Sequence, residues 1–367
     1  MAKNFVGAYY YPGWHHCPVR DASFPKGWSE WDLVYHAKPR FDGHDLPLLP
    51  LWGREDESDP EVFARKIDAA CRYGVDAFVF AFYWSRGKRL LEGALKKGLL
   101  GSDNRQKIRF ALMWANRMPR RVMPVKNSTA AVIDPSRLVY TDPADFVEFV
   151  ATVADEYFIC PEYLELNGGK YLSIFDTAFF LKQLEPENAR QAIIRAREIL
   201  STRNMKLHLA AIDPIPEHRQ HLKEIGFDSV THYVFLPDWK GPFLQDYDEY
   251  AEKRQQQWQL YPEETGLEYF PSVATGWDAN PRGSDYGKEK PGKYPWSPVI
   301  INRNPKKFGN FLGSALNFLK AGSYDQDRLC MIASWNEWSE GHYLEPDEHE
   351  KFAWLEAVQN ARSACGY

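Results

Sequence analysis

The 367-residue chain has no excess of positive charge, since 45 Lys and Arg face 50 Asp and Glu and leave a formal net charge of −5. Binding to nucleic acid phosphates requires a basic surface, so we expect no nucleic acid partner. No apolar run approaches the ~18 residues of a membrane span, and the first residues lack the apolar segment of a secretory signal. We therefore expect no membrane partner and a cytoplasmic protein, or a periplasmic or secreted one if a signal peptide has been removed.

Cysteine is scarce and its spacing carries no motif. The five cysteines, at positions 17, 71, 160, 330 and 365, are odd in number and form no C-x-x-C pair, which predicts reduced thiols. The adjacent pair His15 and His16 lacks a third ligand at a fixed spacing, so we expect no metal site. No G-x-G-x-x-G follows the first predicted strand and no P-loop is present, and we expect no cofactor.

Aromatic residues are the abundant class, at 15% of the chain. By composition alone this surplus favours a large core, although a cleft that stacks on sugar rings would require the same residue types.

Short apolar runs alternate with helical patterns from one end of the chain to the other. This alternation is typical of repeated βα units around a parallel sheet. Eight runs are found, near residues 5–11, 76–83, 107–114, 170–175, 206–211, 228–235, 268–274 and 328–335. The sequence therefore predicts an α/β fold, a (β/α)₈ TIM barrel, as a single domain over residues 1–367. It does not indicate an oligomeric state.

Two of the intervening helices have clear ends. One is predicted to begin at Asp59-Pro60 and to end at Gly74, and another to begin at Asn304-Pro305 and to end at Gly322. Both carry an apolar face, as expected for helices that lie on a sheet.

Three long segments follow predicted strands and precede their helices, at residues 12–58, 115–142 and 276–303. In a barrel such segments gather at the carboxyl ends of the strands, where active sites are built. The connections from helix back to strand are short. This asymmetry favours a barrel enzyme over an open doubly wound sheet.

The densest group of polar and aromatic residues follows the eighth run, at residues 333–346. Glu337 and Glu340 are three residues apart, so in a helical turn their Cβ atoms would lie ~5–6 Å from each other. Two close carboxyl groups have pKa values that are driven apart, which provides both an acid and a base. Glycoside cleavage uses such a pair.

These residues lie in a recognisable motif. The stretch Trp-Asn-Glu-Trp-Ser-Glu-Gly at 335–341, with Leu-Glu-Pro at 344–346, resembles that of glycoside hydrolase family 99 and of the larger family-99-like group called WbsX-type. Further blocks are similar to the WbsX-type group: 9–12 with 14–15, 83–84 with 87–91, 114–116, and 276–278 with 281–282. Together they extend over nearly the whole chain.

The resemblance implies a (β/α)₈ barrel that cleaves mannose-like α-glycosides with retention. In family 99 the first Glu of the E-x-x-E motif is a base toward the substrate's own 2-hydroxyl, which yields a 1,2-anhydro sugar. The second Glu acts first as acid and then as base. By motif position, Glu337 would be the 2-hydroxyl base and Glu340 the acid and base.

Fourteen further residues are candidates for contact with a carbohydrate substrate, because they belong to these blocks or end a predicted strand. For Trp84 a core position is an equal alternative, and for Asn116, Asp213 and His232 local capping is equally compatible. Asp278 is expected to form a buried pair with Arg282 that orders its loop. The candidates are Tyr9, Tyr11, Trp14, His15, Trp84, Trp114, Asn116, Asp213, His232, Tyr233, Trp277, Asp278, Asn336 and His342.

Two other functions remain open. Members of the WbsX-type group have been labelled glycosyltransferases, which often carry a D-x-D motif, and this chain has one at 325–327 and another at 246–248. The first precedes the eighth strand and would lie at the opposite face of the barrel, and the second is placed as a helix cap. A carbohydrate-binding barrel without catalysis would use the same aromatic residues.

Overall fold

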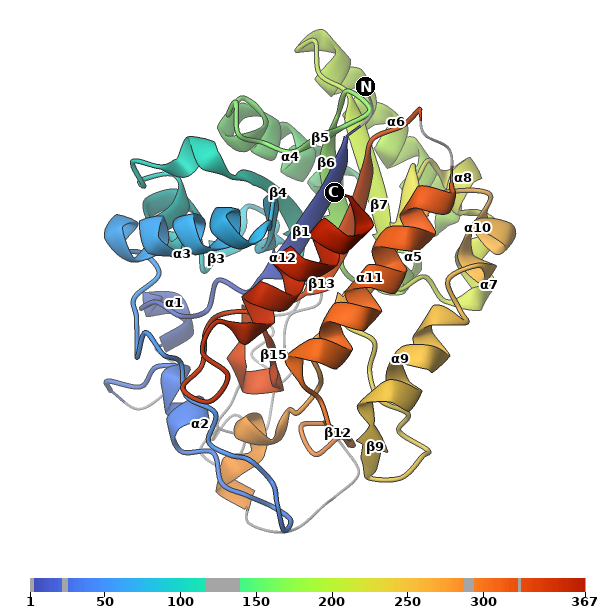
Figure 1. Ribbon diagram of the computed structural model, residues 1–367. Helices are drawn as coiled ribbons and strands as arrows, with labels where there is room; N and C mark the ends of the chain where they lie inside the picture. Colours follow the sequence, from blue (N-terminus) through green and yellow to red (C-terminus); the bar gives the residue numbers. More distant parts are fainter. Residues whose placement is uncertain (1–2, 22–25, 117–138, 287–293, 323–324, 367) are drawn as a thin grey trace.

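The computed structural model describes residues 3–21, 26–116, 139–286, 294–322 and 325–366. Its centre is a parallel sheet rolled into a barrel (Figure 1). The barrel strands are β1 (Asn4–Tyr10), β2 (Ala77–Ser85), β4 (Arg109–Trp114), β6 (Gly169–Ile174), β7 (Leu207–Ile212), β8 (Ser229–Thr231), β10 (Glu268–Phe270), β11 (Ser272–Ala274) and β13 (Arg328–Ala333).

The barrel closes through the predicted run 268–274, which forms two short strands rather than one. β10 pairs with β8, and β11 pairs with β13 on the other side. Pro271 separates them and has no N–H to donate, but its carbonyl accepts from the Met331 amide at 2.8 Å. The predicted (β/α)₈ barrel is confirmed. The sixth run is shorter than predicted, since only Ser229–Thr231 is a strand.

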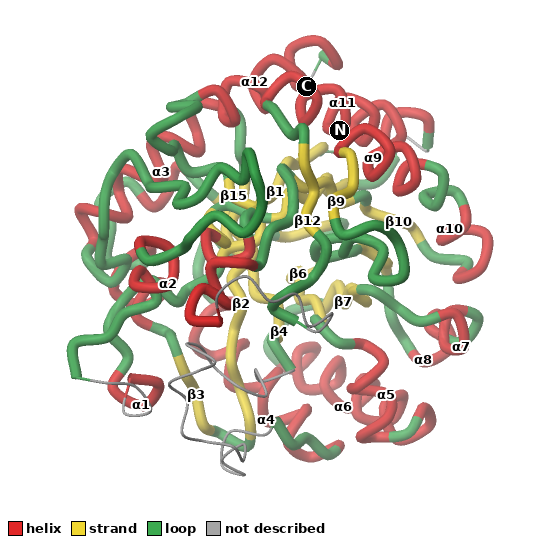
Figure 2. Tube along the Cα trace, turned by 90° about the horizontal axis from the view of Figure 1, so that it is seen from below, coloured by secondary structure: helices red, strands yellow, loops and turns green. Residues whose placement is uncertain are grey.

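Helices form a ring around the strands, as the view along the barrel shows (Figure 2). α3, α4, α6, α11 and α12 are the longest of them. The helices are α1 (Pro18–Asp21), α2 (Trp31–Tyr35), α3 (Pro60–Tyr73), α4 (Pro143–Val153), α5 (Thr177–Leu184), α6 (Pro186–Thr202), α7 (Pro216–Arg219), α8 (Leu222–Ile225), α9 (Tyr247–Gln255), α10 (Leu260–Thr265), α11 (Pro305–Ala321) and α12 (Ala353–Cys365).

The helix ends predicted from sequence are confirmed. The Asp59 side chain accepts from the Glu61 amide at the start of α3, and Gly74 ends this helix at φ 88°, where a side chain would be strained. Asn304 caps α11 through the Lys307 amide, and the chain leaves that helix at Gly322. Both helices therefore begin and end where their capping residues dictate.

The strands alternate their side chains between the two faces of the sheet. Tyr9 lies inside the barrel, where its ring meets Tyr233 edge-on, whereas Tyr10 faces outward and stacks on Phe80. Because side chains alternate along a strand, Tyr11 returns to the inner side. On the outer face, the ring of Tyr10 also lies 5.2 Å from that of Phe63 of α3, so this face packs against a helix.

The described residues of the segments 12–58 and 276–303, which leave out 22–25 and 287–293, lie at the carboxyl ends of the strands, as predicted. The first segment contains α1 and α2. The second contains β12 (Val299–Ile301), which pairs with β9 (Leu244–Asp246). Residues 117–138 of the predicted loop 115–142 lie outside the described residues. In the described part of the chain four short strands complete the pairing. β3 (Lys88–Leu90) pairs with β2, β5 (Glu165–Leu166) pairs with β6, and β14 (Asn336–Glu337) forms a hairpin with β15 (His342–Tyr343).

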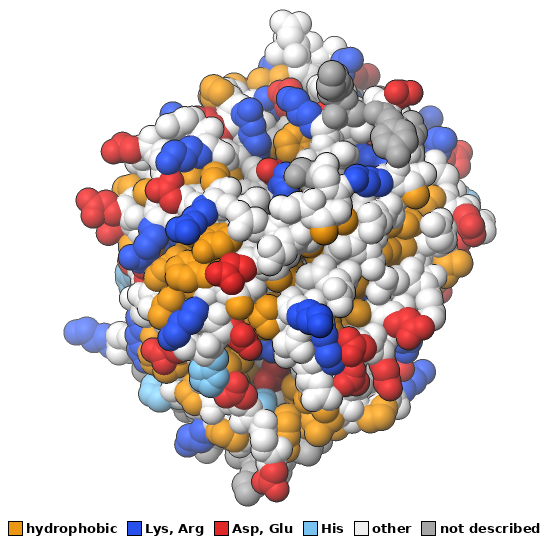
Figure 3. Space-filling view, in the orientation of Figure 1, with side chains coloured by type: hydrophobic (Ala, Val, Ile, Leu, Met, Phe, Trp, Pro, Cys, Tyr) orange, Lys and Arg blue, Asp and Glu red, His pale blue; other side chains and the backbone are white. Residues whose placement is uncertain are grey.

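Acidic and basic side chains are interspersed on the face formed by α11 and α12 (Figure 3), in keeping with the small net charge. Among the described helices, none combines the length and the apolar character that a membrane span requires.

Candidate active site

Glu337 and Glu340 lie side by side at the carboxyl end of β13. Glu337 ends the short strand β14, and the 3₁₀ turn Trp338–Glu340 follows it. In a 3₁₀ turn, side chains three residues apart eclipse each other. The two side chains are only 5% and 12% exposed, so the expected pairing is present and is nearly buried.

Arg282 joins the two carboxyl groups. Its Nη2 donates to Oε1 of Glu337 at 2.9 Å, and its Nη1 donates to Oε1 of Glu340 at 2.8 Å. Its Nε donates to Oγ of Ser339, between the two, at 2.8 Å. A planar guanidinium with donors on three nitrogens suits such a bridge, and a lysine could not reproduce it.

A third carboxyl group, that of Glu30, belongs to the same cluster. It comes from the long segment after β1 and is 4% exposed. Its Oε2 accepts from the Tyr11 hydroxyl at 2.5 Å, while its Oε1 lies 3.4 Å from Nη2 of Arg282 and 3.2 Å from Oγ of Ser339. Three acids therefore surround one arginine at the mouth of the barrel.

The pKa values of the two motif carboxyls move in opposite directions. Burial raises the pKa of Glu337 well above its usual range, and the charges of Glu340 and Glu30 add to this effect while Arg282 opposes it. Burial also acts to raise the pKa of Glu340, but Arg282, His342 and Tyr294 outweigh it and lower that pKa to about 2. These opposite shifts favour a proton on Glu337 over one on Glu340.

Tyr294 and His342 complete the surroundings of Glu340. The Tyr294 hydroxyl donates to Oε1 of Glu340 at 2.5 Å and accepts from Arg282. His342 Nε2 lies 3.4 Å from Oε2 of the same carboxyl, and burial lowers the pKa of this histidine, which keeps it neutral. Glu340 thus has partners on both of its oxygens.

A cavity of about 180 Å³ opens above the carboxyl groups. Aromatic rings dominate its walls, and its polar groups converge on one side. This combination is typical of small-molecule sites, which are mostly apolar with a few placed polar groups. The lining residues are Tyr11, Trp28, Glu30, Leu33, Ala81, Tyr83, Met113, Ala115, Phe175, Tyr233, Arg282, Glu337 and Glu340.

A buried ionic cluster holds the motif loop from below. Glu345 accepts from the indole N–H of Trp335 at 2.9 Å and of Trp338 at 2.7 Å, the two residues that flank the loop of Glu337. Lys66 of α3, 1% exposed, donates to Glu345 at 2.5 Å and to Glu57 at 2.8 Å. One cation thus anchors two buried carboxylates, and through Glu345 both tryptophans of the motif.

Trp84 and Trp114 lie away from the cavity. The Trp84 indole donates to Asp145 of α4 at 2.9 Å, and Trp114 packs against Phe149 of the same helix. Trp84 therefore occupies the core position that the sequence left open. Its neighbour Tyr83 lines the cavity instead, because adjacent strand residues face opposite sides.

The change Trp84→Phe tests this placement. It removes the indole donor from Asp145, which is 5% exposed, and a buried acceptor without its donor costs ~1–3 kcal/mol of stability. We expect a lower midpoint of urea unfolding for this variant. The neighbouring change Tyr83→Phe is the control, since it leaves the contact between Trp84 and Asp145 in place. An unchanged midpoint for Trp84→Phe would contradict the placement.

Several predicted contacts lie deeper in the barrel than the cavity. The Tyr9 hydroxyl donates to the His232 carbonyl at 2.9 Å. The His232 ring is held between the hydroxyls of Tyr269 and Tyr261 at 3.0 and 2.8 Å, and Asp213 lies 3.6 Å from it. Tyr9 and His232 are therefore buried beneath the site, whereas the Asp213 side chain is 43% exposed, and none of the three lines the cavity.

Other predicted residues tie loops together. Trp14 donates to the Asn336 carbonyl at 2.9 Å, and the Asn336 amide bonds both backbone groups of Tyr11, which fastens the motif loop to the end of β1. The Asn116 side chain donates to the Asp176 carbonyl and accepts from the Asp176 amide. Asn116 thus has the local capping role that the sequence left open. His15 is buried and lines a separate hollow beside Arg54 and Asp56.

The expected pair of Asp278 with Arg282 is wrong. Asp278 bonds the His44 ring at 2.7 Å, and its amide donates to the Glu340 carbonyl at 2.8 Å. Arg282 instead serves the three carboxyl groups. Trp277 stacks on the His342 ring at a centroid distance of 5.7 Å, so these two predicted residues support the loop of Glu340.

Sequence reasoning missed Glu30, Tyr83 and Tyr294, and gave Arg282 another partner. A signal for Glu30 was present, since Trp28-Ser29-Glu30-Trp31 has the same pattern as Trp335-Asn336-Glu337-Trp338. Nothing in the sequence distinguishes Tyr294 from other tyrosines.

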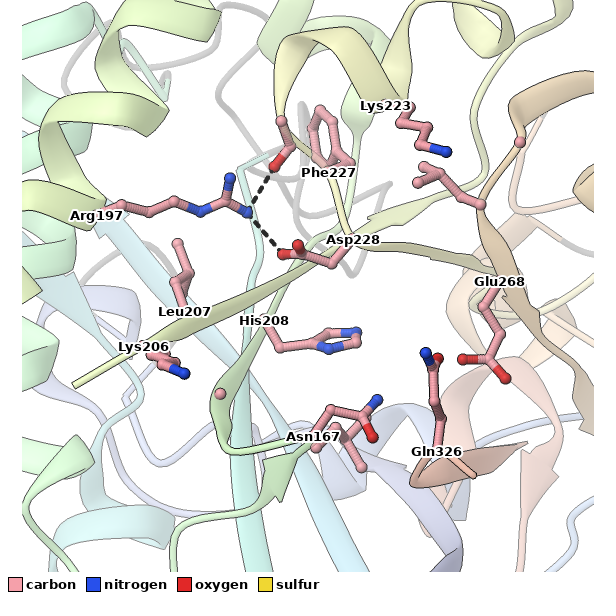
Figure 4. Close-up of a pocket in the computed structure, with 15 residues that line it drawn as sticks. Asn167, Arg197, Lys206, Leu207, His208, Lys223, Phe227, Asp228, Glu268 and Gln326 are labelled. Carbon is pink, nitrogen blue, oxygen red and sulfur yellow. Dashed lines mark hydrogen bonds and ion pairs between the residues drawn. The ribbon is translucent and has the colours of Figure 1, made fainter. Parts of the chain in front are cut away.

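A second cavity, of about 520 Å³, lies at the amino ends of the strands (Figure 4). Both carboxylates in its lining are paired, Asp228 with Arg197 at 2.7 Å and Glu268 with Arg328 at 3.0 Å. His208 at its centre bonds Ser229 at 2.8 Å. In TIM barrels this end contributes stability rather than catalysis, so the smaller cavity above Glu337 is the better candidate.

Comparison with known proteins identifies the family of the chain. The sequence model of the family described as Glycosyltransferase WbsX matches residues 6–358. The uncharacterized protein WxcX of Xanthomonas campestris pv. campestris is 29% identical over 374 residues, which cover 96% of this chain and 49% of that protein. The chain thus spans about half the length of the curated relatives it matches.

Two solved structures share its fold. The GH99 endo-α-mannosidase of Bacteroides thetaiotaomicron gives a TM-score of 0.63 at 13% identity, covering 100% of this chain and 98% of that one. A glycoside hydrolase-like protein gives a TM-score of 0.59 at 15% identity, covering 98% and 94%. At these identities the likeness establishes the barrel fold.

Proposed function

The chain belongs to the WbsX family, and from this premise we propose that it is a glycoside hydrolase that cleaves α-mannoside-like linkages in an oligo- or polysaccharide with retention. The paired carboxyls Glu337 and Glu340 carry the proposal. They lie at the floor of an aromatic cavity, they share Arg282, and their pKa values diverge. One acid and one base at a single site are what glycoside cleavage needs.

In the proposed reaction Glu337 accepts the proton of the substrate's 2-hydroxyl, whose oxygen then attacks the anomeric carbon. The glycosidic bond breaks, and its oxygen takes a proton from Glu340. Water then opens the 1,2-anhydro ring at the anomeric carbon: Glu340 accepts the proton of the water, the bond between the anomeric carbon and the 2-oxygen breaks, and Glu337 returns its proton to the 2-oxygen. Each step inverts the anomeric centre, so the overall outcome is retention. No carboxylate of the protein bonds to the sugar.

These roles require the shared proton to move when the sugar binds. Arg282 and Tyr294 both donate to Oε1 of Glu340 and help to hold its pKa low. Tyr294 is 43% exposed, so a sugar hydroxyl that enters here can replace it. Losing that donor raises the pKa of Glu340, and an Arg282 that turns toward Glu337 lowers the pKa of Glu337. Binding itself would thus set the two protonation states.

The family name makes a glycosyltransferase the second candidate. Its D-x-D motifs are not at the cavity. Asp327 binds the Lys3 and Asn167 amides near the amino ends of the strands, at 2.8 and 3.0 Å. Asp246 caps α9 through the Asp248 amide and accepts from Asn302 at 2.7 Å. These contacts favour hydrolysis over a transfer that uses this motif.

Mass spectrometry of products tests the proposal. The protein is incubated with a panel of mannans and of bacterial and plant oligosaccharides, with and without nucleotide sugars and divalent cations. We expect fragments without any nucleotide sugar, and none from the double variant in which Glu337 and Glu340 are both Gln. In ¹⁸O water, one labelled hydroxyl should appear on the new reducing end.

Two other results would overturn the proposal. Products that form only with a nucleotide sugar would establish the transferase. Sugar binding without turnover across the panel would establish a binding barrel.

A further inference from the structure

We infer that Glu30 is a positioning residue of the active site, which holds Arg282 in its bridge between Glu337 and Glu340. The inference rests on the proposed function for its kinetic meaning, and its geometry stands by itself. It assigns a role to the segment after β1, which lies far from the motif in sequence.

The burial and contacts of Glu30 separate it from an ordinary loop carboxylate. It immediately precedes α2, and its side chain points to the cluster, where it is 4% exposed. Its Oε2 has two cationic or hydroxyl partners, the Tyr11 hydroxyl at 2.5 Å and Nη1 of Arg20 at 3.6 Å. Arg20 is itself fixed by the carbonyls of Gly13 and His15 at 2.6 and 2.8 Å. Glu30 is thus held on one oxygen by two groups that are themselves fixed in place.

The other oxygen of Glu30 shares both its partners with Glu337. Nη2 of Arg282 lies 3.4 Å from Oε1 of Glu30 and 2.9 Å from Oε1 of Glu337. The Ser339 hydroxyl lies 3.2 Å from each of the same two oxygens. This hydroxyl already accepts from Nε of Arg282 and has one hydrogen to give.

The hydrogens that Ser339 and Arg282 can donate define the role of Glu30. The single hydrogen of Ser339 can go to only one of the two carboxyl groups at a time, so Nη2 of Arg282 is the donor that both of them share. Glu30 thereby holds Nη2 of Arg282 while Glu340 holds Nη1, and the charge of Glu30 raises the pKa of Glu337. The titratable and charged groups that face Glu30 are Tyr11, Arg20, Tyr83, Arg282 and Glu337.

The change Glu30→Gln separates charge from shape. Gln keeps an oxygen toward Arg282 and Ser339 but removes the negative charge. Because the pair needs one proton in the reaction and the pKa of Glu337 is the higher of the two, the ionisation of Glu337 forms the basic limb of the profile of kcat/KM against pH. Without the Glu30 charge this ionisation becomes easier, so we expect the basic limb to move to lower pH by about 1 unit, with KM nearly unchanged.

Asp32→Asn is the matched control. Asp32 lies in α2, two residues from Glu30, but is 25% exposed and pairs with Arg54 outside the cavity. The profile of kcat/KM against pH of Asp32→Asn should coincide with that of the wild type. Glu30→Asp keeps the charge and should restore the position of the limb. If the limb of Glu30→Gln coincides with that of the wild type while all proteins melt alike, the inference is wrong.

A titration of the empty protein by ¹³C NMR, with labelled glutamate carboxyls, tests the same point without turnover. The Glu337 signal is assigned through its loss in Glu337→Gln. We expect it to titrate at lower pH in Glu30→Gln than in the wild type, and an unchanged titration would overturn the inference. A protein that shows this shift but cleaves no glycoside would retain the role of Glu30 and refute the proposed function alone. If Glu30→Gln fails to fold, Glu30→Asp and the wild type are compared in the same titration.

Discussion

Replacing Glu340 with Gln is expected to reduce turnover of a natural oligosaccharide by ~10²–10⁴-fold, the usual contribution of a general acid and base. Gln retains an oxygen that can accept from Arg282 and Tyr294 at the present 2.8 and 2.5 Å, so the fold and the bridge should persist. The measurement is the initial rate of fragment release, with circular dichroism as the check on folding. A variant that works at the wild-type rate would remove Glu340 from the mechanism.

The leaving group distinguishes the roles of the two carboxyls. The dinitrophenolate of a dinitrophenyl glycoside leaves without protonation. Glu340→Gln should therefore release it in the first turnover nearly as fast as the wild type. Glu337→Gln should remain slow with the same substrate, because formation of the anhydro ring still needs the 2-hydroxyl base. The opposite pattern would mean that the roles are exchanged, as the protonation of the empty site would favour.

The change Lys66→Met is expected to cost ~3–5 kcal/mol of stability, because it leaves two buried carboxylates without their cation. Lys66 is 1% exposed, and Glu57 and Glu345 are 0% and 3% exposed. Met fills much of the volume of the lysine stem, so the loss reports on charge rather than on a void. Urea unfolding followed by tryptophan fluorescence measures it.

The loss should depend on pH in a defined direction. Burial, with Glu345 beside it, already raises the pKa of Glu57 to about 7, while Lys66 lowers it. Without Lys66 that pKa rises further above the unfolded value of ~4.3. A carboxyl with a raised folded pKa is most stabilising in its protonated form, and this stability is lost as pH rises through the folded pKa. The variant should therefore lose more stability at pH 8 than at pH 5.

Lys107→Met is the control for this change. Lys107 pairs with Asp68, which lies on the same helix as Lys66, but both side chains are more than half exposed. Exposed pairs contribute little, so unfolding of this variant should be close to that of the wild type at both pH values. Equal stability of Lys66→Met and the wild type at pH 8 would contradict the account of the buried cluster.

Much of the architecture could be predicted because it depends on short stretches of sequence. The apolar runs and the caps at Asp59 and Asn304 predicted strands and helices that the structure contains. The sequence left open whether Trp84 lies in the core or at the cavity, because strand alternation puts Trp84 and Tyr83 on opposite sides without deciding which of them faces inward. That choice depends on α4, whose Phe149 and Asp145 receive Trp84, and no local pattern identifies these partners in advance.

The sequence by itself determined the barrel and the pairing of Glu337 with Glu340, because both follow from periodicity and from a spacing of three residues. Only the tertiary structure decided that Arg282 bridges the pair, that Glu30 joins it, and that Asp278 binds His44 instead. Their loops are separated by up to 309 residues along the chain. Closure of the barrel brings their ends together, and the need to neutralise buried carboxylates selects which cation lies between them.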